Sequence, residues 1–270
     1  MMGISIAGFD PSGGAGIIAD MKTFQGLGVH GTSAITALTA QNPNKVFSLI
    51  PIDVEYIEEQ IDSIFDEYGE YISYGKTGML YSTEIIKTVA KKIKEYNINI
   101  VVDPVMIASA GGSLLKEEEK KEKEAKIQKA KEEIAKSFKK YLLPHSLITT
   151  PNISEAEIIS GIKIKTPEDG KKAAQEIGKI ANVIITGGHL DGVNTIFNKE
   201  NNEIKNIKKP LIETKNVHGS GCSFSAALTG YMIKDNTLNE SIRKALDFTE
   251  IAIKNGKYMT LQQSHIDFKK

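Results

Sequence analysis

A glycine-rich turn followed at once by a thiol stands near the C-terminal end of the sequence. Residues 218–222 read HGSGC, and residues 223–232 are mostly apolar or small, which is typical of a buried helix. Such a turn directs free backbone N–H groups toward one point, where the helix dipole adds partial positive charge. We predict an anion-binding turn with Cys222 at a helix N-terminus, where its pKa can fall enough to form a thiolate. A small buried cysteine on a core-facing helix is the alternative interpretation.

A second glycine-rich segment, residues 8–20, follows the first apolar run of the chain and reads GFDPSGGAGIIAD. Its glycines permit a tight turn and a close backbone approach to a ligand before a helix begins. Gly14, Gly16 and Ala19 match the G-x-G-x-x-A pattern of dinucleotide-binding loops, but residues 23–52 contain no acid to bind the ribose. The sequence therefore disfavours a nicotinamide or flavin enzyme.

Two acidic residues follow predicted strands. Asp103 ends the apolar run INIVV, and Glu155 comes three residues after Asn152 in the segment TPNISEAE. Carboxylates at the carboxyl ends of strands can help to hold Mg²⁺ on nucleotide phosphates. Each also has a structural interpretation, because Asp103 can be a solvated turn residue and Glu155 can be the N3 partner of a helix cap at Asn152.

The elements that must position these residues alternate between short strands and longer helices. Apolar runs of strand length begin at Ile4, Ser33, Val46, Ile72, Ile98, Ser146 and Val183. Between them, apolar residues recur three and four positions apart, as in residues 54–65 and 85–93. This order predicts an α/β fold with a mostly parallel sheet covered by helices on both faces. Ligands then bind at the carboxyl ends of the strands.

Composition narrows the class of protein further. The 270 residues include 34 Lys plus Arg and 34 Asp plus Glu, so no net positive charge attracts nucleic acid. The single cysteine fits a reducing compartment, and no apolar run has the length of a membrane span. We therefore expect a cytoplasmic protein without nucleic-acid or membrane partners. No linker or repeat divides the chain, which predicts one domain over residues 1–270.

Residues 116–140 are mostly Lys and Glu, with opposite charges spaced four apart as on a helix surface. Ile127, Ala130, Ile134 and Phe138 form a thin apolar stripe in the same segment. The pattern predicts a long solvated surface helix that packs along one edge. A docking site for a charged partner is the alternative.

Several short motifs occur together in one order along most of the chain. They are AGFDPSGGAG with the following AD, AQN at residues 40–42, KTGML at 76–80, VVDPVM at 101–106, TPN-x-x-E at 150–155, GGH at 187–189 and HGSGC at 218–222. In this order the sequence resembles the hydroxymethylpyrimidine/phosphomethylpyrimidine kinases of thiamine biosynthesis, in the ribokinase-like superfamily. The resemblance implies a single-domain, three-layer sandwich and a homodimer.

The resemblance implies a kinase that uses ATP and Mg²⁺. It would phosphorylate the hydroxymethyl group of 4-amino-5-hydroxymethyl-2-methylpyrimidine and then the resulting monophosphate. The pyrimidine pocket would comprise Gly8, Asp20, Gln41, Met79 and Val105. The catalytic set would be Gly219, Ser220 and Gly221, which hold the transferring phosphoryl group, with Cys222 as the base. Asp103 and Glu155 would act around Mg²⁺, and the nucleotide and its phosphates would contact Lys76, Asn152, Thr186, Gly188 and Lys215.

The sequence also departs from that family pattern. A Lys usually precedes GGH, but Thr186 stands there, so Lys215 or Lys76 would have to supply the missing cation. The family's glycine-rich C-terminal stretch is replaced by NGKYMTLQQSHIDFKK. Two alternatives therefore stay open: a pyridoxal or pyridoxine kinase, and a catalytically weak pyrimidine-binding sensor.

Overall fold

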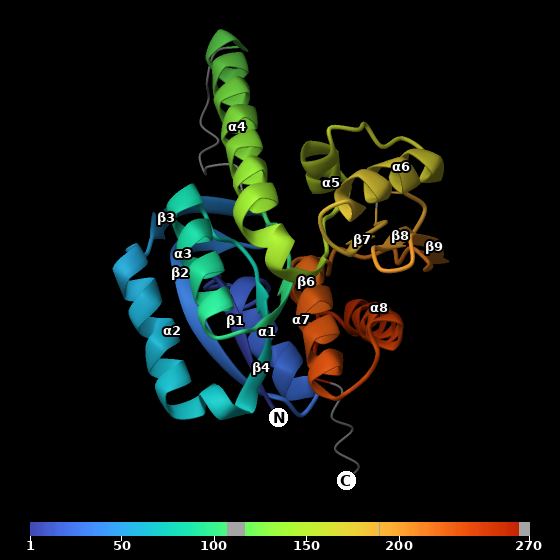
Figure 1. The fold of residues 1–270 in the computed structure, drawn as a ribbon. Coiled ribbons are helices and arrows are strands. Elements are labelled where there is room, and N and C mark those ends of the chain that lie inside the picture. Colours follow the sequence, from blue (N-terminus) through green and yellow to red (C-terminus); the bar gives the residue numbers. More distant parts are fainter. Residues whose placement is uncertain (107–116, 189, 265–270) are drawn as a thin grey trace.

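The computed structural model describes residues 1–106, 117–188 and 190–264, and the strands in these ranges form one nine-stranded sheet (Figure 1). The strands are β1 (Met2–Phe9), β2 (His30–Asn42), β3 (Lys45–Pro51), β4 (Ile72–Thr77), β5 (Asn99–Val102), β6 (Ser146–Thr149), β7 (Val183–Ile185), β8 (Val193–Asn198) and β9 (Glu203–Lys208). Their order in the sheet is β3-β2-β1-β4-β5-β6-β7-β8-β9. The central pairs from β2 to β7 are parallel, and β3, β8 and β9 add antiparallel edges.

Helices join the strands and cover both faces of the sheet (Figure 1). They are α1 (Gly16–Gly26), α2 (Val54–Tyr68), α3 (Thr83–Glu95), α4 (Glu117–Ser137), α5 (Ile153–Ser160), α6 (Pro167–Gly178), α7 (Ser220–Ile233) and α8 (Leu238–Lys254). Short helices η1 (Gly69–Tyr71), η2 (Phe138–Leu142) and η3 (Leu143–His145) complete the connections. The parallel strands with helical connections match the α/β fold that the sequence predicts.

The central strands are apolar on both faces because helices pack against each face. In β5, Ile100 and Val102 belong to the core under α2, α3, α5 and α6, while Val101 belongs to the core under α1, α7 and α8. Successive side chains of a strand point to opposite faces, so a continuous apolar run is needed when both faces are buried. This requirement explains why the parallel strands are easy to recognise in the sequence.

The seven strands expected from the sequence are all present, but β8 and β9 were not anticipated. β9 is a half-exposed edge strand whose sequence EIKNIK contains only two apolar residues. β8 pairs with it across an Asn-containing turn. β9 lacks the long apolar run that signals a central strand because it is an edge strand in contact with water. β8 lies inside the sheet, but the polar residues Asn194 and Thr195 interrupt its apolar run.

Helix α4 projects from the body of the protein, as expected for the charged segment (Figure 1). Its last part is anchored, since Ala135 is buried, Ile134 packs against the same core, and Phe138 at the start of η2 is buried directly after it. Ala130 is exposed and Ile127 is only partly covered. The expected apolar stripe therefore docks the helix only near its C-terminal end.

Candidate active site

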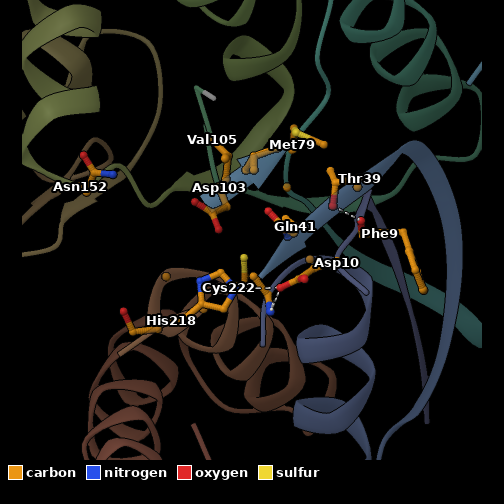
Figure 2. A pocket seen from close by; sticks show the side chains of 18 of the residues that line it. Phe9, Asp10, Thr39, Gln41, Met79, Asp103, Val105, Asn152, His218 and Cys222 are labelled. Atoms are coloured by element: carbon orange, nitrogen blue, oxygen red, sulfur yellow. Dashed lines mark hydrogen bonds and ion pairs between the residues drawn. The ribbon is translucent and has the colours of Figure 1, made fainter. Parts of the chain in front are cut away.

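A cavity of about 370 Å³ lies at the carboxyl ends of the parallel strands (Figure 2). The residues that end or follow β1, β4, β5 and β6 line it, and the start of α7 closes one side. This is the edge of the sheet where α/β proteins bind ligands, and the volume suits a small molecule. The location agrees with the sequence-based expectation.

Most of the residues expected to form the site meet in this cavity. Its lining includes Gly8, Gln41, Met79, Asp103, Val105, Asn152, Glu155, Thr186, Gly219, Ser220, Gly221 and Cys222. They come from both glycine-rich segments, from β2 and from the loops after β4, β5, β6 and β7. Four expected residues do not line it: Asp20, Lys76, Gly188 and Lys215.

Asp20 and Lys76 form an ion pair beneath the cavity floor. Lys76 Nζ lies 3.0 Å from Asp20 and 4.0 Å from Asp103, and the side chains of Lys76 and Asp20 have no solvent exposure. Ser5 donates a hydrogen bond to Asp20, and Ser225 donates one to Asp103. The placements of Asp20 in the pyrimidine pocket and of Lys76 on the phosphates are therefore corrected, because neither side chain reaches the cavity.

The remaining cation expected near the phosphates is also elsewhere. Lys215 is exposed outside the cavity, and Gly188 is an exposed loop residue. Thr186 does line the cavity, and its backbone N–H donates to the Pro151 carbonyl at 2.9 Å. Within the described parts of the chain, no Lys or Arg side chain lines this cavity. The family pattern has a Lys where this chain has Thr186. Neither Lys215 nor Lys76 supplies a positive charge to the cavity in its place.

Cys222 lies in the first turn of α7 and faces the cavity (Figure 2). Its removal from bulk water raises the pKa of its thiol to about 12, against the lowering effect of the buried Lys76 charge; the charges of Asp103 and Asp20 raise it further. In the protein without ligands this favours a protonated thiol at neutral pH, opposite to the thiolate expected from the helix start alone. Cys222 does lie at the N-terminus of α7, where the helix dipole acts to lower the thiol pKa, but burial raises that pKa by more.

The turn before α7 is shaped by close packing against the first glycine-rich segment. Gly219 caps the helix with φ +84°, and a Cβ there would collide with the Gly14 carbonyl oxygen. Only glycine fits both requirements. The Ser220 N–H donates to the Val217 carbonyl at 3.1 Å, so it is already used within the turn. Without a side-chain cap at Gly219, the helix start is open toward the cavity.

Asp103 and Glu155 both line the cavity, and both are almost completely buried. Burial raises the pKa of Asp103 to about 6, with Lys76 opposing and Asp20 adding to the rise. Burial and the charge of Asp103 raise the pKa of Glu155 to about 8. Glu155 also forms the capping box of α5 with Asn152. The interpretation of Glu155 as the N3 partner of a helix cap at Asn152 is therefore confirmed. Two carboxylates that repel each other at one wall favour a bound cation.

The cavity contains polar residues that sequence reasoning did not select. Asp10 and His218 contact each other across it, at 2.8 Å between Asp10 Oδ2 and His218 Nε2. Both stand inside the quoted motifs, but nothing local indicates that they meet. Thr150 also lines the cavity, and its buried hydroxyl has no hydrogen-bond partner within the described residues. An unsatisfied buried hydroxyl of this kind is well placed to bind a polar ligand atom.

Two features are missing from the described residues. No helix in the described ranges is long and apolar enough to cross a membrane. Among residues whose placement is described, no group of three or more His, Cys, Asp or Glu could hold a metal by itself.

Comparisons with known proteins find similar sequences over most of this chain. The family model for phosphomethylpyrimidine kinase matches residues 10–267. A hydroxymethylpyrimidine/phosphomethylpyrimidine kinase of Bacillus subtilis is 40% identical over 257 residues, which are 93% of this chain and 89% of that protein.

Solved structures of two kinases have the same fold. A phosphomethylpyrimidine kinase from Clostridium difficile is 37% identical, with a TM-score of 0.74 over 94% of this chain and 99% of that one. A pyridoxal kinase of Bacillus subtilis, solved with ADP, is 36% identical, with a TM-score of 0.81 over 94% of this chain and 92% of that one.

Proposed function

The chain belongs to the phosphomethylpyrimidine kinase family, and from this premise we propose that it phosphorylates a hydroxymethylpyrimidine and then its monophosphate. The donor is ATP, and the first acceptor is the hydroxymethyl group of 4-amino-5-hydroxymethyl-2-methylpyrimidine. The product is the pyrimidine diphosphate used in thiamine biosynthesis. The observation that carries the proposal is the meeting of Gln41, the open start of α7 and two carboxylates in one cavity.

Each group in the cavity suits one part of this reaction. The Gln41 amide offers a donor and an acceptor to the edge of an aminopyrimidine, and Gly8, Met79 and Val105 surround it. Residues 219–221 present the helix start to the transferring phosphoryl group. Because phosphoryl transfer has a loose transition state, positioning and charge neutralisation contribute most of the catalysis. The Cys222 sulfur is placed to accept the hydroxyl proton of the pyrimidine when it is in the thiolate form.

Asp103 and Glu155 are the residues that would hold Mg²⁺. Mg²⁺ usually binds through one or two carboxylates together with substrate phosphates, so a pair of acids is sufficient. Their mutual repulsion and burial fit such an ion, which would neutralise phosphate charge during transfer. Asn152 and Thr186 lie on the same wall and would contact the nucleotide phosphates.

The stability of the metal-free protein should fall as pH rises from about 5 to about 8. The pKa of Glu155 is about 8 in the folded protein and 4.5 as a model value, so the folded form binds more protons in this interval. The stability contributed by the protonated Glu155 side chain is therefore fully present below pH 4.5 and is lost as the pH rises through about 8. Urea unfolding at several pH values measures this slope.

Glu155→Gln is the control, because Gln keeps the capping arrangement and does not titrate. Its stability should change less between pH 6 and 8.5 than that of the wild type. Mg²⁺ should restore wild-type stability more at pH 8 than at pH 6, since its carboxylate ligands must be deprotonated. Equal slopes for the two proteins would contradict the assignment of the raised pKa to Glu155.

The test of the proposed function is product analysis by mass spectrometry. The protein is incubated with ATP, Mg²⁺ and equal amounts of hydroxymethylpyrimidine, its monophosphate and pyridoxal. Pyrimidine diphosphate is the expected product. Pyridoxal phosphate alone would indicate a vitamin B6 kinase, an alternative favoured by the 36% identity to a pyridoxal kinase. Pyrimidine binding without any product would indicate a sensor.

We also propose that residues 1–270 form one ribokinase-like domain with three layers, in a cytoplasmic enzyme, and that α4 is a surface insertion. The two apolar cores on opposite faces of the sheet support the three layers. The lone cysteine supports a reducing compartment. The segment 107–115, IASAGGSLL, has the paired glycines and small residues typical of a mobile flap over phosphates, and it lies outside the described residues.

A homodimer through the β2–β3 edge is proposed from its exposed apolar side chains. Leu38 and Ile50 are paired across the two strands and are 42% and 65% exposed, and Phe47 is 55% exposed. An apolar patch at a sheet edge favours association with a second copy.

We expect Ile50→Asp to convert the dimer to a monomer in light scattering. Leu211→Asp, at an exposed apolar residue outside this edge, should leave the dimer intact. A monomeric wild-type protein would refute the proposal.

A further inference from the structure

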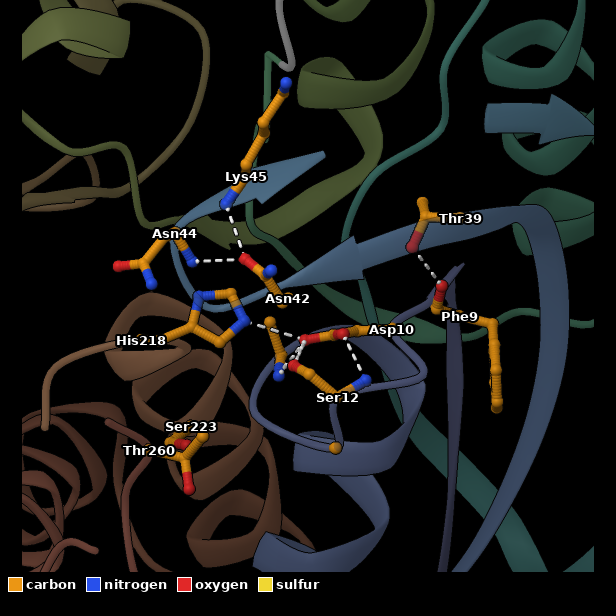
Figure 3. Close-up of polar contacts among 12 residues, drawn as sticks. Phe9, Asp10, Ser12, Thr39, Asn42, Asn44, Lys45, His218, Ser223 and Thr260 are labelled. Atoms are coloured by element: carbon orange, nitrogen blue, oxygen red, sulfur yellow. Dashed lines mark hydrogen bonds and ion pairs between the residues drawn. The ribbon is translucent and has the colours of Figure 1, made fainter. Parts of the chain in front are cut away.

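Asp10 is a buried carboxylate that joins separate parts of the cavity wall (Figure 3). It is 1% exposed, yet it accepts hydrogen bonds from the Ser12 N–H at 2.8 Å, the Ser12 hydroxyl at 2.9 Å and the Ala15 N–H at 2.9 Å. His218 Nε2 donates to the same carboxylate at 2.8 Å. The contacts with Ser12 and Ala15 stabilise the loop that contains Asp10, whereas the contact with His218 links this loop to the turn before α7.

The contact with His218 connects the two glycine-rich segments. The imidazole packs against Gly14 so closely that a Cβ there would collide with its Cδ2 atom. One residue further, Gly219 packs on the Gly14 carbonyl. The position of the turn at residues 218–221 therefore depends on the loop that Asp10 organises. Any shift of that loop would move the start of α7 relative to the ring-binding side of the cavity.

Gln41 lies beside Asp10 in the cavity (Figure 2), and both side chains line it. The Gln41 amide contributes, with the hydrogen bonds of His218 and Ser12, to lowering the pKa of Asp10 to about 2, against the raising effect of burial. An ionised carboxylate can only accept hydrogen bonds. An amide beside such a carboxylate is favoured with its NH₂ group turned toward it, which gives the orientation of Gln41. One amide hydrogen and the amide oxygen then remain for a ligand.

We propose that Asp10 is a positioning residue that fixes the Gln41 amide toward the substrate ring and, through His218, holds the turn at residues 218–221 in register with it. This inference rests on the proposed function, because it concerns recognition of the same pyrimidine. With the amide fixed, its oxygen accepts from an exocyclic amine and its free N–H donates to the adjacent ring nitrogen. A 4-oxo ring presents the opposite pattern and requires a flipped amide. Asp10 thus selects the 4-amino ring without touching it.

Asp10→Asn tests the selection step. Asparagine can either donate or accept, so it permits both orientations of Gln41. We expect the ratio of kcat/KM for the 4-amino substrate to that for its 4-oxo analogue to fall about tenfold or more, in line with the loss of one orienting hydrogen bond. A general loss of activity would lower both values and leave the ratio unchanged. An unchanged ratio in folded D10N protein would overturn the proposal.

His218 variants test the connection to the phosphate side. His218→Phe keeps a ring but removes the donor, and we expect kcat to fall at least tenfold with little change in KM for the pyrimidine. His218→Gln can return an N–H near the Nε2 position and should recover most of kcat. The D10N and H218F effects on kcat should be strongly non-additive in the double variant, because both act on the same contact between positions 10 and 218. Additive effects, or no recovery by Gln, would refute the connection.

Ser12→Ala is the matched control. It also removes a hydrogen bond to Asp10, but one that stays within the loop. Its ratio for the 4-amino and 4-oxo rings should equal that of the wild type. Wild-type protein provides the second control: if it phosphorylates no pyrimidine, the proposed function fails. If it does so and D10N keeps the ratio, only the role of Asp10 fails. Thermal melting of every variant separates loss of folding from loss of position.

Discussion

Replacement of Cys222 by alanine is expected to lower kcat by about 10² to 10⁴, the usual contribution of a general acid or base. The thiol faces the cavity from the first turn of α7, and the residues expected to bind the ring surround another part of the same cavity. Because the thiol acts on the reacting hydroxyl and not on the ring, KM for the pyrimidine should change little. Steady-state kinetics with saturating ATP measures both constants.

The raised pKa of Cys222 gives this prediction a pH signature. With a pKa of about 12, the thiol of the free protein is almost entirely protonated at neutral pH. The thiolate fraction then grows about tenfold for each pH unit below that value. Above pH 8, where Glu155 is ionised, kcat/KM of the wild type should therefore continue to rise. Cys222→Ser should show neither this rise nor wild-type turnover. Full activity in either variant would exclude Cys222 as the base.

Lys76→Met should destabilise the protein by about 3–5 kcal/mol, the usual cost of leaving a buried charge without its partner. Lys76 has no solvent exposure, and its ammonium lies 3.0 Å from Asp20 and 4.0 Å from Asp103. Burial acts to lower the pKa of Lys76, but the charges of Asp20, Cys222 and Asp103 raise it above its usual value. Removal of this ammonium leaves two buried carboxyl groups without compensation. Urea unfolding at pH 7 measures the free-energy change.

Two comparisons make the Lys76 prediction specific. Asp20→Asn combined with Lys76→Met removes both charges of the closest pair, so it should recover part of the lost stability. Lys91→Met removes an exposed ammonium that is 2.8 Å from Glu58, and it should change stability by less than about 1 kcal/mol. If Lys76→Met behaved like Lys91→Met, the buried pair would not support the cavity floor.

Much of the fold could be predicted because its signals are local. The central strands are recognisable since burial on both faces requires continuous apolar runs, and the helices between them repeat apolar residues at helical spacing. The cap formed by Asn152 and Glu155 spans three residues and is equally visible. β8 and β9 were missed because an edge hairpin needs no such run.

The ionisation of the site could not be predicted from the sequence. The position of Cys222 at a helix start suggested a lowered pKa, and burial reverses that effect. Lys76 could be taken for a phosphate-binding cation, because its motif does not reveal that β4 runs through the centre of the sheet. The degree of burial depends on every neighbouring element, so it follows only from the assembled structure.

Ordered motifs and strand ends are properties of the chain, so they indicate the family and the edge of the sheet at which a ligand is expected to bind. Which polar groups meet at that edge follows only from the packing of the whole fold. Asp10 and His218 are 208 residues apart, and their contact exists because two glycine turns pack without side chains between them. Asp20 and Lys76 are 56 residues apart and pair beneath the same cavity. Such pairings follow from close packing, which no local spacing encodes.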